Sequence, residues 1–109
     1  MEDMNDRRGL WVPLNEEGME EYHHMGEESE NLYSCYFPSE EFQYFDNNFV
    51  WDIYDITNVL IEDYEEETLT ADDCRKCYKI VEKHKDKIPT FWKMFNLAIE
   101  KNTLLGVSC

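Results

Sequence analysis

Two cysteines three positions apart, Cys74 and Cys77, form the most recognisable chemical motif of the chain. Such a pair can supply half of a zinc site or a redox-active dithiol, but zinc signatures need a second pair or added histidines at a recognised spacing. The neighbouring Asp72 and Asp73 would raise the pKa of these thiols, whereas a reactive cysteine needs a lowered pKa. Both cysteines also fall on the apolar stripe of an expected helix. We interpret them as core residues and keep a small metal- or thiol-dependent protein as the alternative.

Two Glu-x-x-His pairs, Glu20 with His23 and Glu21 with His24, have the spacing used in carboxylate-bridged metal bundles. Those bundles need two such motifs on separate long helices, whereas these pairs overlap on one short segment. The chain has no nucleophile elbow, no phosphate-binding glycine loop, no dinucleotide fingerprint and no zinc-protease motif. We therefore predict no catalytic residues, no metal site and no cofactor, and we do not expect an enzyme.

Charge is segregated along the chain, whose formal net charge is −15. The 66 residues from Gly9 to Cys74 contain 19 carboxylates and no lysine or arginine, whereas the 35 residues from Arg75 to Cys109 carry eight bases against three acids. Such a distribution attracts basic surfaces and repels phosphates, so direct binding of nucleic acid is not expected. Acidity can also serve solubility alone, which leaves an acidic adaptor without an inhibitory role as a further alternative.

Acidic and aromatic residues alternate in several places, as in Trp51-Asp52, Tyr54-Asp55 and Asp63-Tyr64. Tyrosine and tryptophan anchor protein interfaces, and charges steer the encounter and suppress wrong partners. A rigid surface of carboxylates can also mimic the phosphates of nucleic acid. The pattern predicts a small inhibitor that binds a basic protein surface, such as that of a nuclease or another nucleic-acid enzyme. The residues expected to contact the partner are Glu62, Asp63, Tyr64, Glu65, Glu66 and Glu67, followed by Asp52 and Asp55.

In size and charge the chain is similar to small acidic anti-defence proteins of phages and to immunity proteins that neutralise nuclease toxins, although no motif assigns it to either group. The oligomeric state stays open, including a head-to-tail contact between the C-terminal bases of one copy and the acids of another. The first residues carry no secretory signal, and no apolar run reaches the length of a membrane helix. We therefore expect a cytoplasmic protein without a membrane partner.

The elements that carry these residues are expected to form one small α+β domain over residues 9–109, preceded by a flexible tail over residues 1–8. Three main helices would pack on a short antiparallel sheet of two or three strands. The expected strands are 9–14, 31–37 and 103–107, with a short helix after residue 15 and one helical turn from residue 39. The main helices are expected at 49–64, 70–85 and 89–101.

The helix predicted over residues 49–64 has an apolar stripe that includes Ile53 and Ile56, widened by Trp51. The acidic run 65–67 would then follow its C-terminus, where carboxylates oppose the helix dipole. Local signals also mark other helix ends. Thr70 with Asp73 resembles a capping box, and Pro89 and Asn102 suit the first turn and the end of the last helix.

Overall fold

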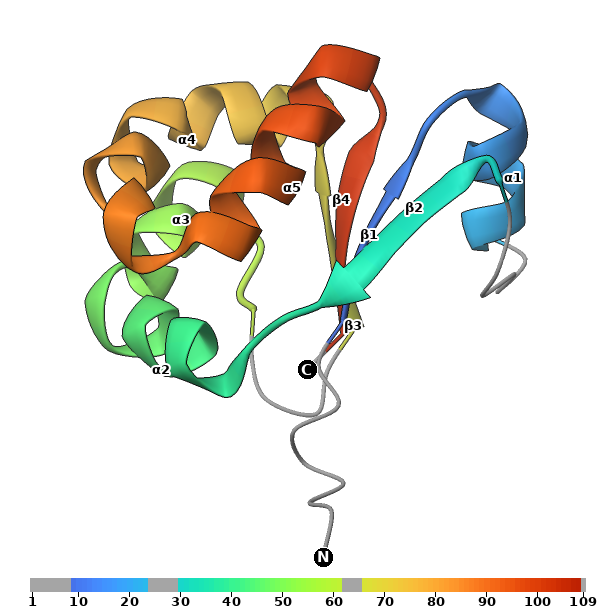
Figure 1. The fold of residues 1–109 in the computed structure, drawn as a ribbon. Coiled ribbons are helices and arrows are strands. Elements are labelled where there is room, and N and C mark those ends of the chain that lie inside the picture. The colour runs from blue at the N-terminus through green and yellow to red at the C-terminus, as the bar shows by residue number, and fades with distance from the viewer. Residues whose placement is uncertain (1–8, 24–29, 62–65, 109) are drawn as a thin grey trace, which may run out of the picture.

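The computed structural model describes residues 9–23, 30–61 and 66–108 of the 109-residue chain. In these residues five α-helices, one 3₁₀ turn and a four-stranded antiparallel sheet make an α+β fold (Figure 1). The elements in chain order are β1 (Gly9–Pro13), α1 (Glu16–His23), β2 (Leu32–Tyr36), α2 (Ser39–Asn48), α3 (Val50–Thr57), β3 (Glu66–Thr70), α4 (Ala71–Lys83), η2 (Lys85–Lys87), α5 (Pro89–Lys101) and β4 (Leu104–Ser108).

The sheet has the strand order β2-β1-β4-β3, and every neighbouring pair is antiparallel. The first and last strands of the chain are therefore its two central strands, joined through the pair Leu10 and Val107. On the outer sides, β2 pairs with β1 and β3 pairs with β4. The two ends of the described chain thus meet in the middle of the sheet, where both strands are hydrogen-bonded on each side.

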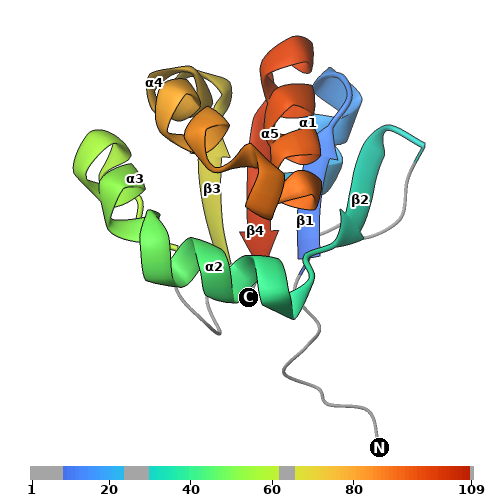
Figure 2. The ribbon, with the colours of Figure 1, turned by 60° about the vertical axis from the view of Figure 1, so that its left-hand side comes forward.

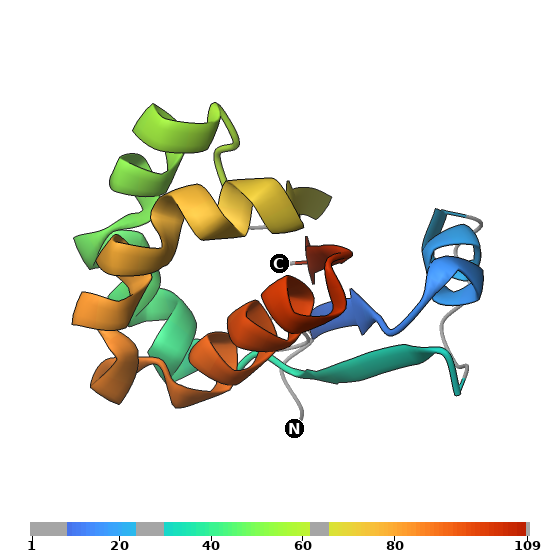
Figure 3. The ribbon, with the colours of Figure 1, turned by 90° about the horizontal axis from the view of Figure 1, so that it is seen from above.

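Helices α2, α3, α4 and α5 cover one face of the sheet, and α1 lies on the opposite side (Figures 1 and 3). Strand residues alternate between these two faces, because successive side chains of a strand point in opposite directions. Leu10, Leu69 and Leu105 point toward the four helices and are fully buried. Six phenylalanine rings complete the core: Phe37, Phe42, Phe45, Phe49, Phe91 and Phe95.

Helix α1 is attached to the outer face of the sheet by Tyr22. The Tyr22 hydroxyl lies 2.9 Å from the Thr68 hydroxyl on β3, so the side chain reaches across β4. Glycine is required beneath it, because a Cβ at Gly106 would overlap the Tyr22 ring. Asn15 caps this helix as the sequence predicts, since the Gly18 amide donates to Asn15 Oδ1 at 2.9 Å.

The α+β class and the three predicted strands are confirmed, but the numbers of helices and strands were underestimated. A fourth strand, β3, occupies Glu66–Thr70, where the sequence predicted only the connection between two helices. The helical turn expected from Ser39 is the ten-residue α2. The helix expected over 49–64 is the shorter α3, and Glu66 and Glu67 of the acidic run lie in β3 rather than at a helix terminus.

Both ends of α3 have a structural cause. Phe49 separates α2 from α3 with a non-helical backbone (φ −145°, ψ 10°), and its ring is buried. Asn58 adopts the left-handed conformation (φ 65°) that ends helices, and its amide donates to the Tyr54 carbonyl at 2.7 Å. Ile61 is buried although it follows the helix in irregular backbone. Burial of apolar residues in this segment therefore continues beyond the end of α3, although the backbone there is no longer helical.

Helices α4 and α5 match the predicted ranges closely. The Thr70–Asp73 capping box is present in both directions, since the Asp73 amide donates to Thr70 Oγ1 at 3.0 Å and the Thr70 amide donates to Asp73 Oδ2 at 3.1 Å. Pro89 occupies the first turn of α5, and Asn102 ends it with φ 56°. Local sequence signals therefore predict both of these helices correctly.

A buried carboxylate from α2 caps the N-terminus of α5. Glu41 Oε1 accepts hydrogen bonds from the Thr90 amide at 3.0 Å and the Phe91 amide at 3.1 Å, and the residue is only 8% exposed. Ile88, which precedes the helix, offers no side-chain cap. Glu41 thus satisfies two of the amides that any helix leaves unpaired at its start, and it joins two elements 49 residues apart.

Replacing Glu41 by alanine is expected to lower the free energy of unfolding by about 2 kcal/mol, because the buried Phe91 amide and the part-buried Thr90 amide lose a charged acceptor. The Glu41→Gln variant keeps an acceptor oxygen and should lose less. The measurement is urea unfolding followed by circular dichroism, with Glu40→Ala as the control because Glu40 is an exposed neighbour in the same turn. Equal stability of Glu41→Ala and Glu40→Ala would contradict the capping role.

Candidate protein-binding surface

The structure places the predicted contact residues on two elements. Asp52 and Asp55 are exposed on α3. Glu66 and Glu67 are successive residues of β3, so they lie on opposite faces of the sheet and do not form one patch. The other predicted contact residues, Glu62, Asp63, Tyr64 and Glu65, lie outside the described residues.

Helix α3 exposes three large apolar side chains beside these two carboxylates. Trp51 is 60% exposed, Tyr54 37% and Ile56 39%. The sequence had placed Trp51 and Ile56 on the inward stripe, and both assignments are wrong. The residues Trp51, Asp52, Tyr54, Asp55 and Ile56 are called the recognition face of α3 below.

The phase of α3 explains why these particular residues face solvent. Val50 and Ile53 are its buried residues and lie on the side toward the core. At 100° per residue, the side chains of the recognition face then fall on the remaining arc of the helix. The Trp51 and Tyr54 rings make an edge-to-face contact with centroids 5.9 Å apart. This contact orders the two rings against each other in the free protein.

The recognition face is supported from below by a small aromatic cluster. The Phe49 ring stacks on the His84 imidazole with a centroid distance of 4.7 Å and an interplanar angle of 4°. His84 Nδ1 also lies 2.7 Å from the Tyr44 hydroxyl of α2. Phe49, which precedes α3, therefore contacts both α2 and the end of α4. These contacts fix the position of α3 and of its recognition face.

The carboxylates of the recognition face have no basic partner in the described part of the chain. The two ion pairs found there join Asp72 to Arg75 at 3.8 Å and to Lys76 at 3.9 Å, and neither involves Asp52 or Asp55. The exposed aromatic rings can bury apolar area against a partner, and the unpaired carboxylates beside them can attract the partner's bases.

The two cysteines of the CxxC motif are buried in α4, as the core interpretation predicts. Burial raises the pKa of Cys74 to about 12, and the adjacent thiol and Asp73 act in the same direction. Burial is also the main cause that raises the pKa of Cys77 to about 11, and the negative charge of Asp73 adds to it. Both groups are therefore neutral thiols at physiological pH, which is the opposite of what nucleophilic or metal-binding cysteines require.

No group of three histidine, cysteine, aspartate or glutamate side chains is arranged to hold a metal ion within residues 9–23, 30–61 and 66–108. Of the two Glu-x-x-His pairs, Glu20, Glu21 and His23 belong to α1, whereas His24 lies outside the described residues. Across the same ranges, no helix is both long and apolar enough to span a membrane.

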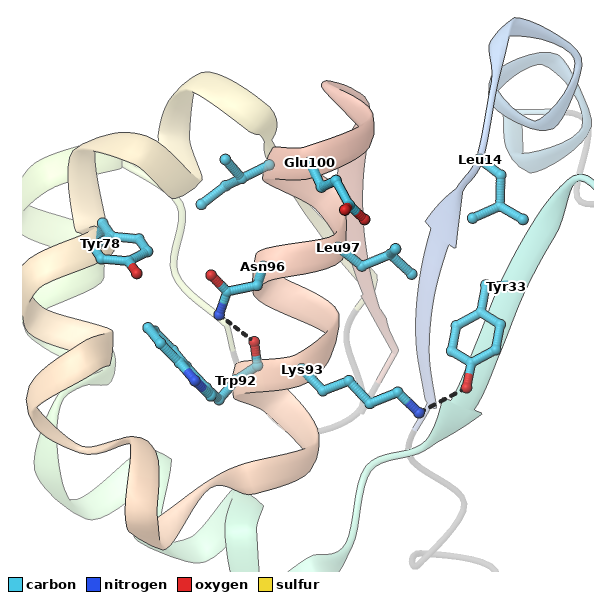
Figure 4. A pocket seen from close by; sticks show the side chains of 9 residues that line it. Leu14, Tyr33, Tyr78, Trp92, Lys93, Asn96, Leu97 and Glu100 are labelled. Atoms are coloured by element: carbon cyan, nitrogen blue, oxygen red, sulfur yellow. Dashed lines mark hydrogen bonds between the residues drawn. The ribbon is translucent and has the colours of Figure 1, made fainter.

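An open groove of about 860 Å³ runs along α5 (Figure 4). Within it, Lys93 Nζ donates to the Tyr33 hydroxyl at 2.7 Å, and this hydrogen bond raises the pKa of Lys93. Asn96 Nδ2 donates to the Trp92 carbonyl of its own helix at 2.8 Å. The groove is lined by side chains of β2 and α5, together with Leu14 and Tyr78. Its residues are Leu14, Tyr33, Tyr78, Trp92, Lys93, Asn96, Leu97, Ile99 and Glu100.

No family model, curated protein or solved structure matches this chain.

Cys74 and Cys77 are expected to resist alkylation in the native protein at pH 8, because burial keeps both thiols protonated. Labelling should become complete only when denaturant unfolds the chain. Mass-spectrometric mapping of iodoacetamide adducts measures this, with the half-buried Cys35 as an internal comparison. Rapid labelling of either CxxC thiol in the folded protein would contradict the core interpretation and favour a thiol-dependent function.

Proposed function

We propose that this chain is a small acidic binding protein that inhibits a nucleic-acid-handling enzyme by covering its basic surface with the recognition face of α3. The observation that carries the proposal is a tryptophan 60% exposed on a short, rigid helix, with Asp52 and Asp55 beside it. Large exposed apolar side chains have a cost in water, and tryptophan and tyrosine are the residues that dominate binding energy in interfaces.

The two carboxylates define the sign of the partner surface. Arginine and lysine side chains that bind phosphates also bind carboxylates, because both anions accept charge-assisted hydrogen bonds. A nuclease or another nucleic-acid enzyme exposes such bases in its substrate groove. A helix that presents Asp52 and Asp55 can occupy that groove and exclude the substrate, so inhibition requires binding alone.

The distribution of charge supports the same proposal. A net charge of −15 on 109 residues raises the energy of the compact state through self-repulsion. The same charge accelerates encounter with a basic partner and repels competing nucleic acid. The described cysteines are free thiols, which suits a reducing compartment, and we place the inhibitor in the cytoplasm.

Removing the two carboxylates is expected to weaken the complex by about tenfold or more, because each loses a close charge pair with the partner. The experiment captures partners from lysate with the wild-type chain and with Asp52→Asn/Asp55→Asn, at about 50 mM and about 500 mM salt. The purified partner is then titrated with both proteins in an assay of its action on nucleic acid.

The matched control is Glu16→Asn/Glu20→Asn, which removes two exposed acids of α1 on the other side of the sheet. We expect this control to inhibit like the wild type. A partner that binds both variants equally, or a complex indifferent to salt, would contradict the proposed role of α3.

Trp51→Ala is expected to weaken binding by about 2 kcal/mol, or about 30-fold in Kd, because the side chain becomes buried only in the complex. Its effect on the free energy of unfolding should stay within about 0.5 kcal/mol, since the ring is largely exposed in the free protein. Isothermal titration calorimetry gives the Kd. Tyr36→Ala is the control, because Tyr36 is an aromatic residue 50% exposed on β2; an equal loss in both variants would count against α3.

A further inference from the structure

A second surface of the molecule has the opposite charge. Helix α4 carries Arg75, Lys76, Lys79 and Lys83, which are all exposed. These four residues are called the basic stripe of α4 below. They lie on the side of the helix away from its buried residues Cys74, Cys77 and Val81, so the basic stripe faces solvent.

The basic stripe lies next to the recognition face. Helix α3 packs against α4, and α3, α4 and α5 follow one another along the helical layer in two views (Figures 2 and 3). Both surfaces point away from the core, because each lies opposite the buried residues of its own helix. The molecule therefore presents an acidic aromatic helix and a basic helix side by side.

Neighbouring charges of opposite sign do not neutralise each other within the described chain. Lys79 and Lys83 have no carboxylate within ion-pair distance there, and neither Asp52 nor Asp55 has a base. Arg75 and Lys76 pair with the exposed Asp72, at 3.8 and 3.9 Å, and Arg75 also donates a hydrogen bond to Asn102 Oδ1. Both surfaces thus keep their charge available for another molecule.

We propose that two copies of this chain form a two-fold dimer, in which the recognition face of α3 in each copy packs on the basic stripe of α4 in the other. A two-fold axis along the seam between α3 and α4 places α3 of one copy over α4 of its partner, and the reverse contact forms at the same time. Such an interface uses the same patch on both copies and closes as a dimer.

The chemistry of the two surfaces favours a second copy as the occupant. Lysine side chains carry apolar stems that can cover Trp51 and Tyr54, and their ammonium groups can lie over the rings or pair with Asp52 and Asp55. The high net charge opposes dimerisation at long range. At physiological salt the Debye length is about 8 Å, so distant acids such as those of α1 are screened, whereas contacts in the interface are screened much less.

The dimer does not depend on the proposed inhibitory function, because it needs no other protein. Its test is sedimentation velocity of the purified full chain over a concentration series at physiological salt. We expect a monomer–dimer equilibrium whose dissociation constant rises at least about tenfold when salt is raised to about 500 mM. Either variant, Asp52→Lys/Asp55→Lys or Lys79→Glu/Lys83→Glu, should sediment as a monomer, because each places like charges opposite one another.

Mixing the two variants gives the decisive measurement. In a mixed pair, the reversed α3 of one chain meets the reversed α4 of the other, and the two unchanged helices meet as in the wild type. Opposite charges are thereby restored in both contacts, and we expect an equimolar mixture to form a heterodimer. The control variant Glu16→Lys/Glu20→Lys reverses two acids of α1 and should dimerise like the wild type.

Three results would overturn the proposal. The first is a wild-type chain that stays monomeric at every concentration tested. The second is a dimer that survives both charge reversals. The third is a mixture of the two folded variants that remains monomeric, with folding verified by circular dichroism. A failure to find any basic partner protein would leave this test unaffected, so the dimer and the inhibitory function can fail separately.

Discussion

Burial of Phe49 determines which side of α3 faces solvent. The ring is 1% exposed, meets Phe45 edge-to-face at 4.9 Å and stacks on His84 at 4.7 Å. To reach this position, the backbone leaves the helical conformation for one residue and α3 restarts with a new phase. Val50 and Ile53 then point inward, so the intervening residues must point outward. The exposed aromatic surface is thus a consequence of core packing one residue before it.

Net charge alone does not identify a binding surface in this molecule. Acidic side chains lie on α1 on one side of the sheet and on α2 and α3 on the other (Figure 1). One of them, Glu41, is buried and caps α5, where it stabilises the fold. Helix α3 differs because its carboxylates alternate with large exposed apolar side chains. A surface that offers both apolar area and charge can bind specifically, whereas dispersed acids mainly increase solubility.

Local sequence signals predicted the parts of the fold that local interactions determine. The Thr70–Asp73 capping box and the left-handed Asn102 define helix ends within a few residues, and both are confirmed. Strand β3 was missed because its sequence, EETLT, has one buried residue, Leu69, and forms only by pairing with β4. The Glu41 cap and the exposure of Trp51 depend on residues far along the chain or on the phase of packing. The alternation of acids and aromatics singled out Asp52 and Asp55 on α3 as candidate contact residues, but it gave no information on which side of the helix Trp51 and Ile56 lie.

Use of one helix face for two contacts has a thermodynamic consequence. If the proposed dimer and the proposed basic partner both cover Trp51, Asp52 and Asp55, only one of them can be bound at a time. The two contacts then compete, and each lowers the apparent affinity of the other by an amount that grows with the concentration of the competing molecule. At high concentration the dimer would keep the aromatic rings buried, and dilution or a stronger basic partner would release the face. In the dimer, the basic stripe of the second copy would occupy the face that binds the partner. The partner displaces the second copy only when its affinity and concentration together outweigh those of that copy.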